Sequence, residues 1–186
     1  MSVAAVILAA GAGTRFDATG GKLLAEAHGR PLVAWAIEPA YEADFDELVV
    51  VTGAVDLGDV IPGEATVLRN DGWQQGQATS LGVALDWCHR QGHAAAVVGV
   101  GDQPGLTADA WLSVAEAPGG PIVMATYAGK RGFPVRLDAS MWSLLPSSGE
   151  EGVATLVRTR PELVVELACQ GAAVDIDTRE DLRKWK

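Results

Sequence analysis

The chain has 186 residues, 48% of them hydrophobic, and a formal net charge of −10 at pH 7, which argues against nucleic acid or an anionic membrane as a partner. This length fits one domain with a single core, so we expect one domain over residues 1–186. Cys88 and Cys169 lack C-x-x-C spacing, and the first apolar run is too short for a membrane span and has no basic start or cleavage site, which predicts a cytoplasmic protein with buried thiols.

The run from Val3 to Ala9 is apolar and rich in Val and Ile, which is typical of a strand buried on both faces at the centre of a parallel sheet. A loop with four glycines and two cations follows: Gly11, Gly13, Gly20 and Gly21, with Arg15 and Lys22. Glycines allow positive φ and let backbone N–H groups approach an anion closely. The stretch predicts a phosphate-binding loop; the alternative is a tight turn whose glycines serve packing alone.

Two common phosphate motifs fail here at specific residues. Leu23 follows Lys22 where a Walker loop needs Ser or Thr, and Phe16 stands where a dinucleotide fingerprint needs its third glycine. The string L-A-A-G-A-G-T-R-F followed by Gly-Gly-Lys instead resembles the signature of the MobA-like nucleotidyltransferases, which include molybdenum cofactor guanylyl- and cytidylyltransferases. The resemblance implies nucleotide binding by Leu8, Ala9, Ala10, Gly11 and Gly13, with Arg15 and Lys22 as catalytic residues.

Helical and strand patterns then alternate. A helix begins at Pro31, and its apolar residues are expected to face the sheet: Leu32, Val33, Trp35, Ala36 and Ile37. Strands are predicted at 48–51, 65–68, 94–100, 121–125 and 163–167, and helices at 78–91 and 107–116, the last one capped by Thr107.

The strand at 65–68 ends in a polar loop, at the edge where open α/β sheets bind ligands. The string Asn70-x-x-Trp73-x-x-Gly76-x-x-x-Ser80 is similar to a family segment that helps form the base and ribose pocket. The resemblance implies that Asn70, Gly76 and Ser80 bind the nucleotide. An ordinary loop with Trp73 as a packing anchor is the alternative.

The strand at 94–100 leads into G-D-Q-P, which places Asp102 at its carboxyl end. A carboxylate at such a position suits a hard cation, and a purely structural turn aspartate is the alternative. G-D-Q-P resembles the metal-binding motif of the family, which implies that Asp102 is a catalytic residue and a ligand of Mg²⁺.

The C-terminal string D-I-D-T-R-E-D-L is similar to the family's D-I-D-T-P-E-D-L. Strand alternation would place Asp175 and Asp177 on one face, so both are candidate second metal ligands. Thr178 is a predicted helix N-cap with Asp181 in a capping box, and the alternative is that the acids serve only this helix start.

Two departures from the family pattern lie in the second half. Phe133 replaces the histidine of a G-H-P-V motif that faces the acceptor, and it follows Lys130 and Arg131, which otherwise read as a solvated hairpin. Glu150 replaces the aspartate of a G-D-E-G-A helix. The Phe133 change weakens any transfer of acceptor identity from the family.

These patterns predict an α/β fold, a Rossmann-like three-layer α/β/α sandwich with a mostly parallel sheet and a late antiparallel strand. The resemblance implies Mg²⁺-dependent transfer of a nucleotidyl group from a nucleoside triphosphate to a phosphorylated acceptor, with release of pyrophosphate. L-A-A-G accompanies cytidine nucleotides in the family and L-A-G-G guanine nucleotides, so Ala10 favours CTP. The implied acceptor is a molybdopterin-type cofactor. The alternatives are a sugar- or polyol-phosphate acceptor, or a non-catalytic nucleotide-binding protein that serves a molybdoenzyme partner.

Overall fold

A computed structural model describes residues 2–16 and 21–185. Its main sheet has seven strands, in the order β5-β4-β1-β6-β8-β7-β9. The strands are β1 (Val3–Ala9), β4 (Glu47–Thr52), β5 (Thr66–Arg69), β6 (Ala95–Val100), β7 (Ile122–Tyr127), β8 (Lys130–Asp138) and β9 (Val164–Ala168). A separate two-stranded ribbon pairs β2 (Glu26–Ala27) with β3 (Arg30–Pro31).

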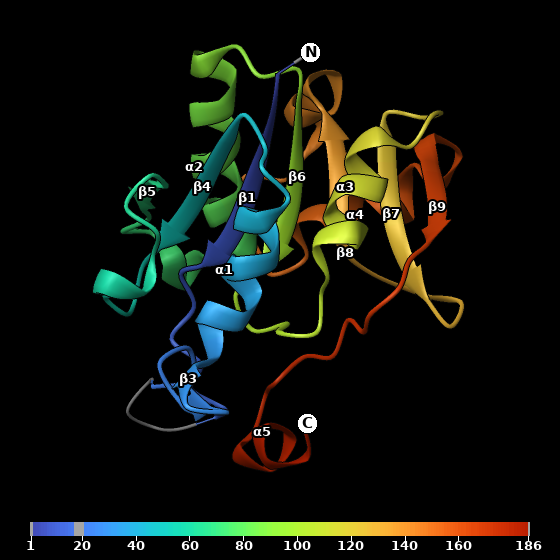
Figure 1. Cartoon of the computed structure of the whole chain (residues 1–186). Helices are drawn as coiled ribbons and strands as arrows, with labels where there is room; N and C mark the ends of the chain where they lie inside the picture. The colour runs from blue at the N-terminus through green and yellow to red at the C-terminus, as the bar shows by residue number, and fades with distance from the viewer. Residues whose placement is uncertain (1, 17–20, 186) are drawn as a thin grey trace.

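Helices cover both faces of the sheet (Figure 1). They are α1 (Leu32–Glu42), α2 (Gln77–Gln91), α3 (Ala108–Glu116), α4 (Gly152–Thr159) and α5 (Arg179–Lys184), with short 3₁₀ turns η1 (Gly58–Val60), η2 (Trp73–Gln75), η3 (Ala139–Leu144) and η4 (Pro161–Leu163). Alternate residues of β1 enter opposite cores, because successive side chains of a strand point to opposite faces. Val6 packs in the cluster that includes α2 and α4, whereas Ile7 packs in the cluster that includes α1 and α3.

The expected fold class is confirmed. β8 runs antiparallel to both of its neighbours, β6 and β7, while β1 is parallel to β4 and β6. After β1 the chain builds β4 and β5 on one side and then crosses back to β6 on the other. The loops that follow β1 and β6 therefore diverge from a shared crevice, which is the position where open α/β sheets bind ligands.

Local cap predictions are also confirmed. The Thr107 hydroxyl accepts a hydrogen bond from the backbone N–H of Ala110 at the start of α3, and Thr178 forms a complete capping box with Asp181 at α5. The expectation of buried thiols is correct for Cys88, whose burial raises the pKa of its thiol to about 12, and wrong for Cys169, which is partly exposed because it lies where the sheet ends and the irregular C-terminal segment begins. No helix in the described ranges is long and apolar enough to cross a membrane.

Trp35 departs from expectation. It is partly exposed rather than packed on the sheet, because the buried stripe of α1 runs through the residues on either side of it. Its indole Nε1–H donates to the carbonyl of Ala27, and its ring meets the ring of Trp185 at 5.6 Å between centroids. Trp35 therefore helps to fasten the C-terminal helix to the N-terminal half of the chain.

Candidate nucleotide site

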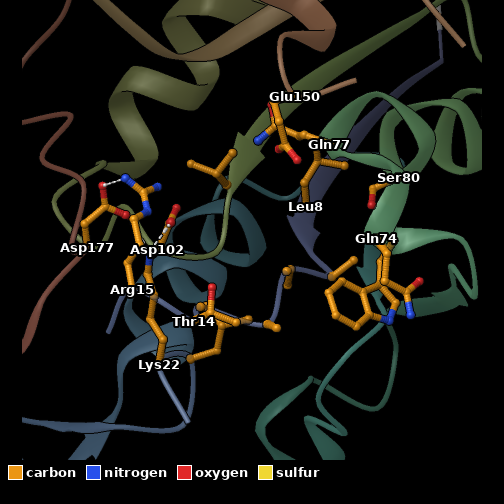
Figure 2. Close-up of a pocket in the computed structure, with 18 residues that line it drawn as sticks. Leu8, Thr14, Arg15, Lys22, Gln74, Gln77, Ser80, Asp102, Glu150 and Asp177 are labelled. Carbon is orange, nitrogen blue, oxygen red and sulfur yellow. Dashed lines mark hydrogen bonds and ion pairs between the residues drawn. The ribbon is translucent and has the colours of Figure 1, made fainter. Parts of the chain in front are cut away.

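A pocket of about 370 Å³ opens at the carboxyl ends of β1 and β6. Most of the residues predicted for nucleotide or catalysis line it: Leu8, Ala9, Ala10, Gly11, Gly13, Arg15, Lys22, Ser80, Asp102 and Asp177. Figure 2 shows Arg15, Lys22, Asp102 and Asp177 together on one side, with Gln74 and Ser80 across the pocket. A charged end and a less charged end therefore face each other across one cavity.

The glycine loop holds Lys22 in place. Gly13 has φ +64°, and a Cβ at this position would lie only 2.5 Å from Cβ of Lys22, so the lysine stem packs directly on the loop backbone. The carbonyl of Gly13 accepts a hydrogen bond from the N–H of Phe16, which closes the turn. Gly20 of the predicted phosphate loop lies outside the described residues.

A cluster of opposite charges forms the end of the pocket. The Lys22 ammonium, whose side chain is only 8% exposed, lies 2.6 Å from Oδ2 of Asp102 and 3.1 Å from Oδ1 of Asp177. Arg15 places Nη1 3.1 Å from Oδ2 of Asp177, but its side chain is 79% exposed. Lys22 is therefore the inner cation of the cluster and Arg15 the outer one.

The C-terminal arm, residues 169–185, brings Asp177 to this cluster. The strand expected around Asp175 is absent, since the chain runs as irregular structure from Cys169 to Thr178. Asp175 is exposed and accepts a hydrogen bond from Nε2 of Gln103 at 2.8 Å. Without a strand the two acids need not share a face, so Asp177 lines the pocket and Asp175 instead ties the arm to the G-D-Q-P turn.

Asn70 and Gly76 do not line the pocket. Asn70 is buried behind it and donates through Nδ2 to the hydroxyl of Ser80, which does line it. Gly76 has φ +101°, and a Cβ there would lie 2.4 Å from the carbonyl of Gly149, so the glycine lets the turn before α4 dock on the start of α2. Both residues support the wall of the pocket from outside.

Ala10 lies at the less charged end. A Cβ on Gly53 would come within 2.8 Å of Cβ of Ala10 and 3.0 Å of Cβ of Trp73, so the three residues are in close contact. The carbonyl of Ala10 also accepts a hydrogen bond from the N–H of Ala54. The position of Ala10 is thus fixed by the end of β4 as well as by β1.

Several lining residues were missed as site residues by the sequence: Ala12, Thr14, Leu23, Trp73, Gln74, Gln77, Val100 and Glu150. Trp73 and Glu150 belong to strings that resemble family segments, which was the available signal. Gln74 and Gln77 lie at unspecified positions of the string from Asn70 to Ser80 and therefore carry no comparable signal.

Phe133 does not line the pocket and packs against both cores. Lys130 and Arg131 are exposed, and Arg131 is paired to Glu166.

The charged end of the pocket offers a divalent metal two carboxylates. Asp102 and Asp177 offer hard oxygen ligands that already converge on one cation, Lys22. Within residues 2–16 and 21–185, no group of three or more His, Cys, Asp or Glu side chains is arranged to hold a metal. Mg²⁺ commonly takes one or two carboxylates and completes its shell with water and substrate phosphates, so two carboxylates beside the glycine loop that is predicted to bind phosphate suit this ion.

Comparison with known proteins agrees with this geometry. The sequence model of the MobA-like NTP transferase domain matches residues 5–164. The bifunctional protein GlmU of Cutibacterium acnes is 36% identical over 113 residues, which are 57% of this chain and 26% of that protein. The match thus takes in only about a quarter of that curated relative.

Solved structures share the whole fold. Rv0371c from Mycobacterium tuberculosis superposes with a TM-score of 0.81 at 26% identity, covering 99% of this chain and 97% of that one. The same protein has been solved in complex with manganese, at 25% identity and a TM-score of 0.80, with the same coverage.

Two further structures, below 25% identity, support the fold alone. The nucleotidyl transferase Mth528 from Methanothermobacter has a TM-score of 0.82 at 22% identity, covering 98% of this chain and 95% of that one. A CMP:2-keto-3-deoxy-manno-octonic acid synthetase, solved with CTP, has a TM-score of 0.71 at 16% identity, covering 99% and 96%.

Proposed function

Because the chain belongs to the MobA-like NTP transferase family, we propose that it transfers a cytidylyl group from CTP to a phosphorylated acceptor, a molybdopterin-type cofactor, and releases pyrophosphate. The observation that carries this proposal is the convergence of Lys22, Asp102 and Asp177 at the end of a glycine loop. In this proposal the described chain acts as one nucleotidyltransferase domain, and its triphosphate substrate favours a cytoplasmic setting.

The reaction needs no covalent intermediate on the protein. A phosphate oxygen of the acceptor attacks the α-phosphorus of the nucleotide, a new P–O bond forms, and the bond to the bridging oxygen of pyrophosphate breaks. The main obstacle is repulsion between the negative charges of the acceptor and the nucleotide. Cations that are already in position lower the activation barrier, because they offset these charges without moving during the reaction. Lys22 and Arg15 would neutralise the α-phosphate and the leaving group. The glycine loop amides would hold the outer phosphates.

Asp102 and Asp177 are the residues that would hold Mg²⁺ in this proposal. When bound, the ion supplies positive charge that neutralises the triphosphate. The manganese complex of Rv0371c supports the use of a divalent metal by a protein of the same fold. Asp175, bonded to Gln103, would serve only to position the arm.

The base is assigned from the opposite end of the pocket. Ala10 lies there in contact with the wall formed by Gly53 and Trp73, and its methyl group would take space that a purine needs. The CMP:2-keto-3-deoxy-manno-octonic acid synthetase solved with CTP shows that a protein of this fold can hold this nucleotide. Ser80 would contact the base and ribose end of the nucleotide, and Asn70 would hold the Ser80 hydroxyl in position from behind.

A sugar- or polyol-phosphate acceptor is the second candidate, because Phe133 weakens the transfer of the molybdopterin acceptor from the family to this chain. The histidine of the family motif is missing at this position, and Phe133 packs into the cores rather than lining the pocket. A third possibility, a non-catalytic accessory protein that serves a molybdoenzyme, would keep nucleotide binding and lack turnover.

A panel of nucleotides and acceptors tests these assignments, with pyrophosphate release as the readout. CTP, GTP, UTP and ATP would each be incubated with molybdopterin and with sugar and polyol phosphates, in the presence and absence of Mg²⁺. We expect release to require Mg²⁺ and molybdopterin and to be fastest with CTP. Release with a sugar phosphate would move the assignment to the second candidate, and tight CTP binding without release from any acceptor would move it to an accessory role.

A further inference from the structure

Lys22 and the proposed metal site share the same two carboxylates. The ammonium lies within 3.1 Å of both Asp102 and Asp177, and the side chain that carries it is almost fully buried. Each of these carboxylates is about one third exposed or less, so both face the pocket and Lys22 at once. A divalent ion bound by this pair would share both carboxylates with Lys22 and would therefore compete with it for their negative charge.

We propose that Lys22 is an internal cation that competes with the divalent metal for Asp102 and Asp177 and is handed over to the triphosphate when nucleotide binds. The inference rests on the proposed function and deepens it. Metal binding is then weak in the absence of nucleotide and strong in its presence, because the triphosphate gives Lys22 another anionic partner.

The local charges support this exchange. Asp102, Asp177, Lys22 and Arg15 have formal charges that sum to zero, so the cluster is balanced as it stands. A divalent cation alone would add excess positive charge next to a buried ammonium, and a triphosphate alone would add negative charge next to two carboxylates. When the divalent cation and the triphosphate bind together, their opposite charges largely cancel, which favours joint binding.

The geometry allows Lys22, rather than Arg15, to make the exchange. Lys22 packs its stem on Gly13, so its ammonium lies beside the backbone that is proposed to hold the phosphates. An ammonium at the end of four methylene groups reorients readily over short distances. Arg15 touches only Asp177 and is largely exposed, so its attraction for that carboxylate is weakened by solvent.

The exchange has a measurable consequence, because coupling between two ligands is reciprocal. If nucleotide raises the affinity for metal, metal raises the affinity for nucleotide by the same factor. Removal of the competing ammonium should strengthen metal binding in the absence of nucleotide and reduce this factor.

The experiment uses Mn²⁺ as the probe and titration calorimetry as the readout. Wild type, Lys22→Met and Lys22→Gln are each titrated with Mn²⁺, with and without a CTP analogue that has a non-cleavable α,β-methylene bridge. Arg15→Met is the matched control, because it removes the outer cation of the same cluster. Circular dichroism confirms that each variant is folded, and Lys22→Gln keeps a hydrogen-bond donor if Lys22→Met does not fold.

We expect both Lys22 variants to bind Mn²⁺ about tenfold tighter than wild type without nucleotide, within the usual roughly 5- to 150-fold range of coupling between sites. The increase in Mn²⁺ affinity caused by the analogue should shrink in the same variants, whereas Arg15→Met should change both quantities less. The thermal midpoint of Lys22→Met should be low without metal and rise on addition of Mn²⁺, because two neighbouring carboxylates are left unpaired.

Two results would overturn the inference. One leaves the proposed function intact, and the other refutes the proposed function as well. If wild type binds Mn²⁺ with the analogue and the Lys22 variants bind it no tighter without nucleotide, the exchange is refuted and the proposed function stands. If neither wild type nor the Lys22 variants bind Mn²⁺ even with the analogue, the metal-dependent transferase proposal fails together with the exchange.

Discussion

The backbone N–H of Ile176 donates a hydrogen bond to the carbonyl oxygen of Asp102, over an N···O distance of 3.1 Å. Ile176 is fully buried in a small cluster with Phe16 and Leu32, beside the glycine loop. One residue of the C-terminal arm is thus fixed to both loops that carry the proposed catalytic groups. The arm lies beyond residue 164, where the family match ends, and Figure 1 shows it running past the sheet to α5, near β3.

Truncation of Ile176 should release the arm. Ile176→Ala removes most of a fully buried side chain, and such changes cost about 2–5 kcal/mol. Because the arm can detach locally, we expect the backbone amides of 176–182 to lose hydrogen-exchange protection while the sheet keeps its own. The catalytic rate should also fall, because a detached arm no longer holds Asp177 at the pocket. Val174→Ala, at an exposed position of the same arm, is the control and should change neither quantity.

The two acids of the arm should behave differently. Asp177→Asn weakens the contacts with Lys22 and Arg15, so we expect a large loss of kcat and of Mn²⁺ affinity with little change in thermal midpoint. Asp175→Asn keeps an oxygen that accepts from Gln103, and we expect activity close to wild type. Steady-state kinetics of the two variants side by side make the comparison. Equal losses in both would place Asp175 at the metal as well.

Gly76 should tolerate no side chain. Gly76→Ala would place a methyl group against the carbonyl of Gly149 and force a residue with φ +101° into a strained backbone. We expect a lower thermal midpoint and a higher KM for nucleotide, because the turn that carries Glu150 moves away from the pocket. Gly82→Ala is the matched control: its Cβ would meet open space within α2, and it should stabilise the helix by about 0.5–1 kcal/mol.

Ala10→Gly should narrow the preference for CTP over GTP. Loss of the methyl group enlarges the end of the pocket next to Gly53 and Trp73, and a methyl-sized difference supports roughly 1–3 kcal/mol of discrimination. The CTP:GTP ratio of kcat/KM is the measurement, with Ala12→Gly as a control for added loop freedom. A wild-type preference for GTP, or an unchanged ratio, would refute the base assignment and leave the proposed phosphate site intact.

Glu47 lies at the amino end of β4, whereas the pocket lies at the carboxyl ends of the neighbouring strands. The contacts of Glu47 predict that the stability of the protein depends on pH. Burial raises the pKa of Glu47, but hydrogen bonds from Thr66, His93 and Trp87 outweigh it, so the folded pKa lies below the ordinary value of 4.5. A carboxyl with a depressed folded pKa stabilises the protein above its unfolded pKa, and this contribution is lost as pH falls through the folded pKa.

Glu47→Gln tests this directly. Denaturant unfolding of wild type and variant would be compared from neutral pH downward. We expect the advantage of wild type to be constant above pH 4.5 and to shrink below it, because only wild type has to protonate this carboxyl. A stability difference that does not vary with pH would contradict the assignment.

Sequence alone determined the type and order of most strands and helices of the central sheet, and it predicted a phosphate-binding role for the glycine loop. Short apolar runs identify β1, β4 and β6 because each strand is buried on both faces, and Thr107 and Thr178 identify helix starts because a cap is made with residues only three positions away. These signals are local, so they survive without knowledge of the fold.

Only the tertiary structure decided which side chains share the site. Lys22 meets Asp102 across 80 positions of sequence and Asp177 across 155, and no local pattern encodes such distances. The same holds for Asn70, which supports Ser80 from behind instead of lining the pocket, and for Trp35, which binds the arm instead of the sheet. Sequence periodicity reports whether a residue is buried, whereas the packing of distant segments decides against which partner it is buried.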